Sequence, residues 1–585
     1  MSATVPQQLS DQVSEWIADE PDPAAVAELQ ALLARAQDGD PAALAELGDR
    51  FAGPLTFGTA GLRGPLRAGP NGMNTAVVRR AAAGLAAQLT ASGRGGGIVV
   101  IGYDGRHGSR SFATDSAAIL AAAGFDARLL PRLLPTPLLA FAVNHFGAVA
   151  GVMVTASHNP PQDNGYKVYA HDGAQIVPPM DAEIEAAIRA VGSARAIAMS
   201  SDYRTLDESV VQAYVVAVAG LVRPGAPREL RVAHTALHGV GAPLIRAVFA
   251  AAGFSAPSEV SEQAEPDPDF TTVSFPNPEE PGAMDLALAL AERDQADLVI
   301  ANDPDADRCA VGAVFPASAD RPGGWRMLRG DEVGVLLADW LLRRGALGTY
   351  ATTIVSSTML SAMAARHGVG FAETLTGFKW ISRAAPDLVY GYEEALGYAV
   401  APGLVRDKDG ISAALLIAEL AADLKAAGSS LPRRLAELAA EYGLHATRQL
   451  SWRVTDLGLI TEAMSRLRAE PPGELLGRPV SVSDLAPDND VVILRFEGGR
   501  VVVRPSGTEP KCKAYLELVI PTAAGQPDEP VTAEPLLAEP LLAADPLLAA
   551  DPLLAAVASA EQRAAAELAS LAAEVTRALG MPSAG

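Results

Sequence analysis

The segment GIVVIGYDGRHGSRSFATDSAAILAAA, residues 97–123, contains a strand pattern, a turn and a helix pattern in direct succession. Residues 97–105 are rich in β-branched side chains and end in a glycine-containing turn, which predicts a buried strand. Residues 110–123 are rich in alanine and precede Gly124, which predicts a helix that stops there. A strand followed by a helix is the unit from which α/β domains are built.

Similar strand patterns recur along the chain. They are GAVAGVMVTAS (147–157), LRVAHTAL (230–237) and ADLVIAND (296–303), and each lies near an alanine-rich helical segment. VVILRFEGGRVVVRPSGTE (491–509) instead predicts a hairpin that turns at Gly498 and Gly499. The chain is therefore expected to be α/β, with parallel or mixed sheets.

The length of 585 residues suggests about four domains. The first 50 residues are expected to form a helical N-terminal extension. The domain boundaries that we predict are 51–220, 221–325, 326–445 and 446–585.

The last predicted domain contains a low-complexity insertion, residues 525–557. Within it the tract 533–556 has a proline every five or six residues, which argues against a continuous helix and predicts a flexible or extended segment. Ser559 and Gln562 form a capping-box pattern, so a helix is expected to start there and run to Gly580. We expect this helix to belong to the last domain, so that the tract interrupts the domain.

Composition limits the classes of partner. The formal net charge of −23 argues against nucleic acid, which needs a basic footprint. The two cysteines are too few for a disulfide framework or a zinc cluster, and the N-terminus has no signal-peptide pattern. No apolar run is long enough to cross a membrane. These features predict a cytoplasmic protein without a membrane partner and leave its oligomeric state open between monomer and dimer.

The loop VTASHNPPQDNGYKVY, residues 154–169, presents a candidate nucleophile. Ser157 follows a strand and precedes a turn made rigid by two prolines, so it is expected on a surface loop. A serine needs a base or an electrophilic substrate, and His158 and Lys167 are nearby in sequence. Taken alone, a serine in such a place favours a turn-stabilising hydroxyl.

The segment DPDADR, residues 303–308, follows the strand pattern of 296–303. Asp303, Asp305 and Asp307 alternate on one turn and can converge on a cation, and an all-oxygen set suits Mg²⁺. The glycine and distal glutamate of an EF-hand loop are missing. Arg308 could hold a phosphate in its guanidinium fork. The alternative is an acidic, solvated turn.

Three neighbouring segments, TGFKW (376–380), GYEEALGY (391–398) and RDKDGIS (406–412), combine paired glutamates with lysines and aromatic residues. Carboxylates such as those of Glu393 and Glu394 can accept hydrogen bonds from two sugar hydroxyls. Taken alone, paired glutamates favour a solvated surface.

The segment RPSGTEPK, residues 504–511, has the composition of an anion site. Gly507 lets backbone amides point at one anion, and Arg504, Ser506 and Thr508 add side-chain donors. The alternative is a plain exit from a hairpin. Together, the four regions indicate phosphoryl transfer on a substrate with two phosphate positions.

The motifs FGTAGLRG (57–64), TASHNP, DPDADR, GYEEALGY and RPSGTEPK occur in the order typical of the α-D-phosphohexomutase superfamily, which the chain resembles over about residues 50 to 520 and the final helix. Their forms are most similar to the branch of phosphoglucomutase-2 and phosphopentomutase enzymes and related actinobacterial phosphomannomutases.

The resemblance implies four α/β domains around a central cleft, the first three with related mixed-sheet cores and the last distinct. It implies a mutase that interconverts hexose 1-phosphate and hexose 6-phosphate, of glucose or mannose, through a phosphoserine and a bisphosphate intermediate. It also implies Mg²⁺, a hexose or pentose bisphosphate as activator, and a small phosphorylated sugar as substrate.

The resemblance also assigns roles to residues. It implies that phosphorylated Ser157 joins Asp303, Asp305 and Asp307 as a metal ligand. Further catalytic residues are Arg63, Lys167 and His158. The substrate-binding residues are Arg308, Gly377, Lys379, Glu393, Glu394, Lys408, Arg504, Ser506, Gly507 and Thr508.

Two departures from the family pattern bear on the substrate. Ala395 stands where many glucose-using relatives have a serine, which leaves mannose or a pentose open, and Gly72 stands where relatives often have arginine. The alternatives are a phosphopentomutase acting on ribose or deoxyribose 1-phosphate, a phosphatase that forms an aspartyl phosphate at DPDADR, and a non-catalytic sugar-phosphate sensor.

Overall fold

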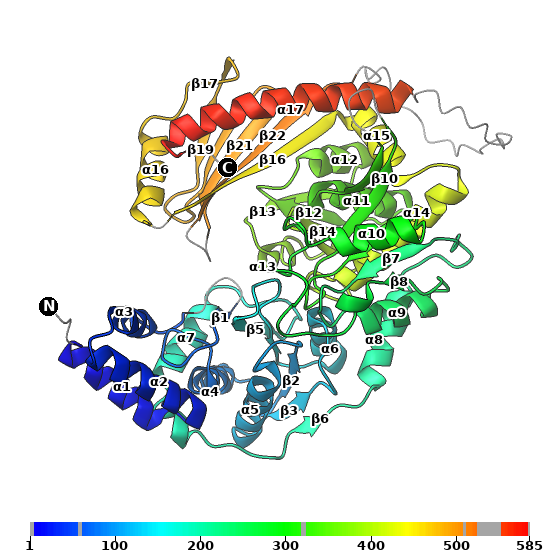
Figure 1. Cartoon of the computed structure of the whole chain (residues 1–585). Helices are drawn as coiled ribbons and strands as arrows, with labels where there is room; N and C mark the ends of the chain where they lie inside the picture. Colours follow the sequence, from blue (N-terminus) through cyan, green and yellow to red (C-terminus); the bar gives the residue numbers. More distant parts are fainter. Residues whose placement is uncertain are drawn as a thin grey trace. The chain divides into compact units, whose positions relative to one another are not determined.

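A computed structural model describes residues 5–56, 61–317, 323–454, 456–506, 511–522 and 552–582 (Figure 1). The chain divides into two compact units. The first contains residues 1–313, 327–353 and 372–423, and the second contains residues 314–326, 354–371 and 424–585. Among the described residues, no helix combines the length and the apolar character that a bilayer crossing requires.

Three helices form the N-terminal extension, as predicted. Asp22 and Asp40 cap the second and third helices by accepting hydrogen bonds from backbone N–H groups of their first turns, and a proline occupies the first position of each. The helices pack around a core that includes Leu29 and Leu47. Their bounds are α1 Gln7–Asp19, α2 Pro23–Gln37 and α3 Pro41–Arg50.

The first sheet has the strand order β1-β5-β4-β2-β3-β6. β2 pairs in parallel with β4, and β4 pairs antiparallel with β5, so the sheet is mixed. The predicted strand and helix of 97–123 are β2 and α5. The bounds are β1 Leu62–Pro65, β2 Ile98–Tyr103, β3 Asp126–Leu129, β4 Ala150–Val154, β5 Asp163–Ala170, β6 Arg204–Thr205, α4 Thr75–Ala91, α5 Ser109–Ala122, α6 Thr136–Phe146, α7 Met180–Ala190, η1 Ala194–Ala196 and α8 Ser209–Ala219.

The second sheet has the order β11-β10-β9-β7-β8 and repeats this arrangement. β7 is parallel to β9, and β9 is antiparallel to β10. The bounds are β7 Val232–Thr235, β8 Ser258–Glu259, β9 Leu298–Ala301, β10 Ala310–Phe315, β11 Gly324–Met327, α9 Ala242–Ala251, η2 Ser261–Gln263 and α10 Asp285–Arg293.

The third sheet has the order β13-β12-β14-β15 and again combines a parallel pair of strands with an antiparallel neighbour. β12 is parallel to β14, which is antiparallel to β15. In all three sheets, a predicted functional turn therefore joins a parallel strand to its antiparallel neighbour. The bounds are β12 Thr349–Thr353, β13 Gly370–Thr374, β14 Leu388–Glu393, β15 Gly397–Ala399, α11 Gly330–Arg343, α12 Met359–His367, α13 Phe378–Ile381 and α14 Gly410–Ala426.

The fourth sheet, in the second unit, is antiparallel throughout, in the order β16-β22-β21-β20-β19. The predicted hairpin is confirmed: β20 and β21 pair, and Gly498 between them has a φ of +73°. The bounds are β16 Leu444–Arg453, β17 Glu474–Leu475, β18 Arg478–Pro479, β19 Ser481–Asp484, β20 Val492–Phe496, β21 Gly499–Pro505, β22 Lys511–Ile520, α15 Leu431–Tyr442, α16 Gly458–Ala469 and α17 Pro552–Leu579.

The last helix, α17, lies along one face of this sheet (Figure 1). It buries Leu568, Leu571 and Val575 in the core of the fourth sheet, which confirms that it belongs to the last domain. The predicted start at Ser559 is wrong, because α17 begins at Pro552. Proline is tolerated at the first helical position, so the last proline of the repeat opens the helix and residues 552–556 are helical. The rest of the tract, like all of residues 523–551, lies outside the described residues.

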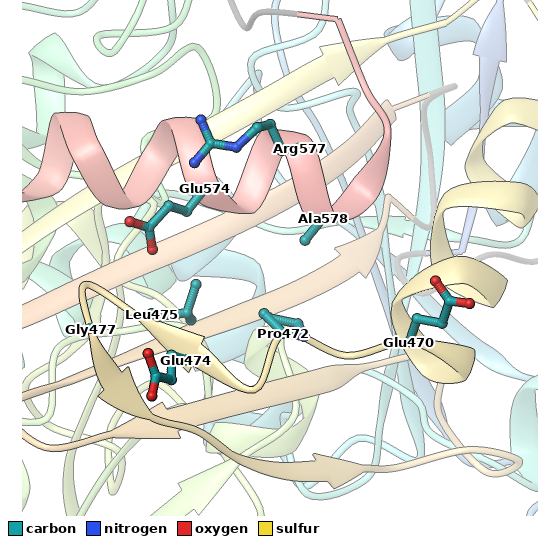
Figure 2. Close-up of a pocket in the computed structure, with 8 residues that line it drawn as sticks. All are labelled: Glu470, Pro472, Glu474, Leu475, Gly477, Glu574, Arg577 and Ala578. Carbon is teal, nitrogen blue, oxygen red and sulfur yellow. The ribbon is translucent and has the colours of Figure 1, made fainter.

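A shallow hollow lies between the end of α16, the β17–β18 hairpin and α17 (Figure 2). None of the site residues predicted from the sequence lines it. Its lining residues are Glu470, Pro472, Glu474, Leu475, Gly477, Glu574, Arg577 and Ala578.

A buried carboxylate on β22 ties the fourth sheet to the segment that leads into α12, within the second unit. Glu517 is 4% exposed, and its Oε1 accepts hydrogen bonds from Ser357 Oγ at 2.9 Å and from the backbone N–H of Thr358 at 2.7 Å. The same oxygen lies 3.0 Å from His445 Nδ1, and Arg500 Nε donates to Oε2 at 2.9 Å. Burial alone would raise the pKa of Glu517, but the hydrogen bond from His445 and the charge of Arg500 lower it to about 2.

We expect Glu517→Gln to destabilise the second unit at pH 7. A pKa that is 4.5 in the unfolded chain and about 2 in the folded one corresponds to about 3 kcal/mol of unfolding free energy. Because the folded-state pKa is depressed, this contribution is complete above pH 4.5 and is lost as the pH falls toward 2. Urea unfolding of the wild type and the variant at pH 7 and pH 3 measures the difference.

The difference in unfolding free energy between the wild type and Glu517→Gln should be less than half as large at pH 3 as at pH 7. A difference that is the same at both pH values would contradict this account. Glu497→Gln, an exposed charge between β20 and β21, is the matched control and should change stability little at either pH.

Candidate active site

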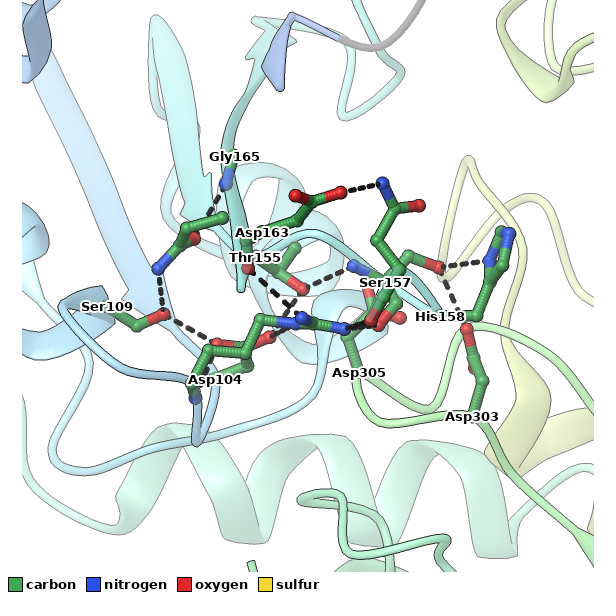
Figure 3. Close-up of polar contacts among 12 residues, drawn as sticks. Asp104, Ser109, Thr155, Ser157, His158, Asp163, Gly165, Asp303 and Asp305 are labelled. Carbon is green, nitrogen blue, oxygen red and sulfur yellow. Dashed lines mark hydrogen bonds and ion pairs between the residues drawn. The ribbon is translucent and has the colours of Figure 1, made fainter. Parts of the chain in front are cut away.

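Ser157 lies in the loop between β4 and β5 and adopts a φ of +53°. This left-handed conformation costs about 1 kcal/mol for a residue other than glycine. It is held in part by the hydrogen bond from the backbone N–H of Ser157 to Thr155 Oγ1, at 2.9 Å. The hydroxyl donates to Asp303 Oδ2 at 2.9 Å and lies 3.2 Å from His158 Nδ1 (Figure 3). Ser157 is only 4% exposed, so the predicted surface position is wrong: the loop faces the acidic turn of the second sheet.

The acidic turn between β9 and β10 is buried. Asp303, Asp305 and Asp307 are each 0% exposed, and one carboxylate oxygen of each lies within 4.8 Å of the others. The alternative of a solvated acidic turn is therefore wrong, and the predicted convergence of the three carboxylates is confirmed.

Two glycines let neighbouring backbone approach this turn closely. A Cβ at Gly239 would lie 2.3 Å from Pro304 Cα, and a Cβ at Gly410 would lie 2.1 Å from the carbonyl oxygen of Arg308. Any side chain at either position would push the turn away. The loop after β7 and the start of α14 thus fix where the carboxylates lie.

Two lysines balance the negative charge of the turn. Lys167, on β5, places Nζ 2.8 Å from Asp305 Oδ2 and 3.0 Å from Asp307 Oδ2. Lys408, just before α14, places Nζ 3.4 Å from Asp307 Oδ2. The nucleophile candidate and Lys167 from the first sheet therefore meet the acidic turn of the second sheet and Lys408 from the segment after the third.

The pKa values reflect this arrangement. Burial and the charges of Asp305 and Asp307 raise the pKa of Asp303 far above its ordinary value. Burial would also raise the pKa of Asp307, but Lys167 and Lys408 hold it below its ordinary value. Burial would lower the pKa of Lys167, but Asp305 and Asp307 raise it, so this lysine is a cation at neutral pH.

The carboxylates fit a divalent cation. Asp305 Oδ1 and Asp307 Oδ1 are buried and have no hydrogen-bond partner among the described residues. Buried polar atoms in native proteins are nearly always paired, so an unpartnered pair of oxygens in a three-carboxylate cluster indicates a ligand. A cluster that offers only oxygen atoms suits a hard cation.

Two arginines lie close to these groups. Arg63, on β1, donates from Nη1 to Asn159 Oδ1 at 3.1 Å, which places it beside the Ser157 loop. Arg308 places Nη1 3.6 Å from Glu279 Oε2 and Nε 3.9 Å from Asp303 Oδ2.

The paired glutamates diverge. A Cβ at Gly397 would contact the side chains of both Lys408 and Glu393, so Glu393 lies beside the site. Burial raises the pKa of Glu393, and Lys408 and Arg308 oppose that effect. Glu394 Oε2 instead accepts a hydrogen bond from Thr353 Oγ1 at 3.2 Å.

The remaining predicted residues lie in or directly before α13, near the end of β21 or in the part of the chain outside the described residues. Gly377, with a φ of +108°, precedes α13, and Lys379 places Nζ 5.2 Å from the centre of the Trp380 ring. In the second unit, Arg504 lies near the end of β21 and Ser506 directly follows that strand. Gly507 and Thr508 lie outside the described residues.

Several residues that contact the site were not predicted. Thr136 Oγ1 donates to Asp305 Oδ2 at 2.6 Å, and Tyr169 donates to Asp407 Oδ2 at 2.7 Å. Tyr169 follows Lys167 by two positions on β5, so the period of a strand places both on one face. Arg106, in the turn after β2, contacts the backbone of the Ser157 loop. The sequence predicted the turn after residues 97–105, but it did not predict the contact of Arg106 with the Ser157 loop.

Four successive regions of the chain match the domains of one protein family. Residues 54–195, 212–313 and 329–442 match α/β/α domains I, II and III of the phosphoglucomutase/phosphomannomutase family, and residues 453–525 match its C-terminal domain.

Individual relatives agree with this. A Haemophilus influenzae protein named probable phosphomannomutase is 45% identical and covers 80% of this chain and 96% of its own. Human phosphopentomutase is 35% identical over 83% of this chain and 88% of its own. The crystal structure of a Thermus thermophilus protein described as a phosphomannomutase is 30% identical, has a TM-score of 0.66, and covers 80% of this chain and 96% of its own. The buried serine and the three carboxylates lie in the regions that match domains I and II. The chain belongs to the phosphoglucomutase/phosphomannomutase family of phosphosugar mutases.

Proposed function

We propose that this enzyme interconverts hexose 1-phosphate and hexose 6-phosphate, of glucose or mannose, with Ser157 as the carrier of the phosphoryl group. The observation that carries the proposal is the 2.9 Å contact between Ser157 Oγ and Asp303 Oδ2 in a buried cluster of three carboxylates. The name of the family model and that of the Haemophilus relative support a hexose.

We further propose that the cation is Mg²⁺ and that Asp303, Asp305 and Asp307 hold it together with an oxygen of phosphorylated Ser157. When bound, the cation would neutralise negative charge on the phosphoryl oxygens. The unpartnered oxygens of Asp305 and Asp307 support this assignment.

The reaction consists of two transfers in opposite directions. In the first, the bond from phosphorus to Ser157 Oγ breaks while phosphorus bonds to a sugar hydroxyl oxygen, which gives up its proton, and Ser157 Oγ regains one. The product is a sugar bisphosphate. In the second, its other phosphoryl group moves to Ser157 Oγ and leaves a hydroxyl on the sugar. Asp303 Oδ2 accepts the hydrogen bond of the free serine hydroxyl, so we expect the serine proton to depart on that side.

Four basic residues lie near Ser157 and the acidic turn. Lys167, Lys408 and Arg308 each lie close to carboxylates of the acidic turn, and Arg63 lies beside the Ser157 loop. We propose that these fixed cations stabilise the charge that spreads over the phosphoryl oxygens during transfer.

The proposed roles of the remaining residues concern substrate binding. Glu393 would accept hydrogen bonds from sugar hydroxyls, because it lies beside Lys408 at the edge of the site. We propose that the phosphate that is not being transferred binds to Arg504, Ser506, Gly507 and Thr508.

A second candidate substrate is a pentose 1-phosphate. Its support is the likeness to human phosphopentomutase and the presence of Ala395 in the turn between β14 and β15. The sugars differ by a carbon that carries a hydroxyl, and a site that hydrogen-bonds this hydroxyl can reject the analogue that lacks it by about 10⁴- to 10⁵-fold.

We expect Ser157→Ala to retain the fold and to lose at least 10⁴-fold in kcat, because no oxygen remains to carry the phosphoryl group. The measurement is ³¹P NMR with Mg²⁺ and a trace of hexose bisphosphate, with glucose, mannose and ribose 1-phosphates tested in parallel. The matched control is Ser111→Ala, an exposed serine on α5, which should keep wild-type turnover.

Conversion of one 1-phosphate resonance into a terminal-phosphate resonance, without free phosphate, would identify the preferred sugar. Normal turnover in Ser157→Ala would refute the proposed carrier. Release of inorganic phosphate, together with an alkali-labile phosphate mapped to residues 303–307, would favour the aspartyl phosphatase instead.

We expect Asp305→Asn to weaken binding of a divalent cation by at least 10-fold, because the cluster loses one carboxylate charge and one of its unpartnered oxygens. Titration with Mn²⁺, followed by electron paramagnetic resonance, measures this affinity without any turnover. Asp202→Asn, an exposed carboxylate in the first unit, should bind Mn²⁺ as the wild type does. Equal affinity in Asp305→Asn and the wild type would place the cation elsewhere.

A further inference from the structure

Arg106 holds the Ser157 loop by its backbone. Its Nη2 donates to the carbonyl oxygens of Ser157 at 2.6 Å and Asn159 at 2.5 Å. Its Nη1 donates to those of Pro160 at 2.8 Å and Asp163 at 3.1 Å. Arg106 is 4% exposed, so these four bonds form away from water. Four carbonyl groups of one loop therefore converge on a single guanidinium.

The guanidinium is itself fixed from two sides. Asp104 Oδ2 lies 3.4 Å from Arg106 Nε and accepts a hydrogen bond from Thr155 Oγ1 at 2.6 Å. Thr155 Oγ1 in turn accepts a hydrogen bond from the backbone N–H of Ser157. Figure 3 shows Asp104, Thr155 and Ser157 connected in this way. The ring of Phe270, from a loop of the second domain, lies 4.9 Å from Arg106 Cζ.

Only arginine can make this set of contacts. The guanidinium is a rigid plane with several donors that diverge from one centre, and it carries a positive charge at neutral pH. A lysine ammonium has three donors on one atom and cannot reach four carbonyl oxygens spread over residues 157–163.

We propose that Arg106 is a positioning residue for phosphoryl transfer. By drawing the carbonyl groups of residues 157–163 inward, it keeps Ser157 in the left-handed conformation that directs Oγ at Asp303 and the acidic turn. Its Nη donors are engaged by the loop backbone, so it acts through Ser157 and not through contact with the substrate. This inference rests on the proposed role of Ser157 as phosphoryl carrier.

The test compares Arg106→Lys with wild type in steady-state mutase assays and in the rate of Ser157 phosphorylation by hexose bisphosphate, followed by intact mass. We expect kcat and the phosphorylation rate to fall at least 100-fold, because displacement of a reacting atom by about 1 Å costs that much. KM should stay within threefold, since the residues proposed to bind the sugar are unchanged. Arg110→Lys, an exposed arginine on α5, is the matched control and should behave as wild type.

A kcat within threefold of wild type in folded Arg106→Lys would overturn the proposal. So would a fall in kcat that is matched by loss of folded protein in urea titrations, because that result shows a structural role alone. If Arg106→Lys does not fold, Asp104→Asn tests the same network by removing the charge that faces Arg106 Nε. It should lower kcat at least 10-fold at constant KM, and a wild-type kcat in that variant would overturn the proposal.

Different results would refute the proposed role of Ser157 and the proposed role of Arg106. A wild-type enzyme that shows no phosphate on Ser157 would refute the proposed carrier, whatever Arg106→Lys does. A wild-type enzyme that is phosphorylated and active, beside an equally active Arg106→Lys, would refute only the role of Arg106.

Discussion

The compensation of buried negative charge at residues 303–307 is the constraint on which the first unit depends. Three carboxylates within 4.8 Å of one another repel, and each has lost its contact with water. Their compensation comes from elsewhere in the chain: Lys167 from the first sheet, Lys408 from the segment after the third, and the hydroxyl of Thr136. Burying the turn therefore requires these parts to be packed together, so assembly of the unit also assembles the site.

The repeated strand arrangement explains why residues so distant in sequence carry one site. In each of the first three sheets, a turn leaves the end of a parallel strand and returns as an antiparallel neighbour. Side chains at the carboxyl ends of parallel strands are where α/β proteins bind ligands. The Ser157 loop, the acidic turn and the turn of Glu393 occupy this same position on successive sheets.

The sequence predicted most of the fold and the chemical identity of the site, because both depend on local patterns. Strand and helix periodicity identified β2, α5, β4, β7 and β9, and the alternating aspartates of DPDADR predicted a cluster that the structure confirms. Burial of Ser157 was not predictable, because it arises from contact with the second sheet. Arg106 and Tyr169 were missed because the residues that they contact lie 51 and 238 positions away in the sequence. The start of α17 was misplaced because the prolines of the tract argue against a continuous helix. Proline is unfavourable inside a helix but is compatible with the first position of a helix.

The position of α17 has a consequence for the order in which the polypeptide acquires its structure during synthesis. β16 to β22 leave the ribosome before α17, so the apolar face that Leu568, Leu571 and Val575 cover stays uncovered until α17 has been synthesised. Until then, that face is exposed apolar surface of the kind that aggregates or recruits chaperones. Release of the nascent chain before residue 552 would leave the fourth sheet without its cover, so the C-terminal domain is complete only after α17 has been synthesised.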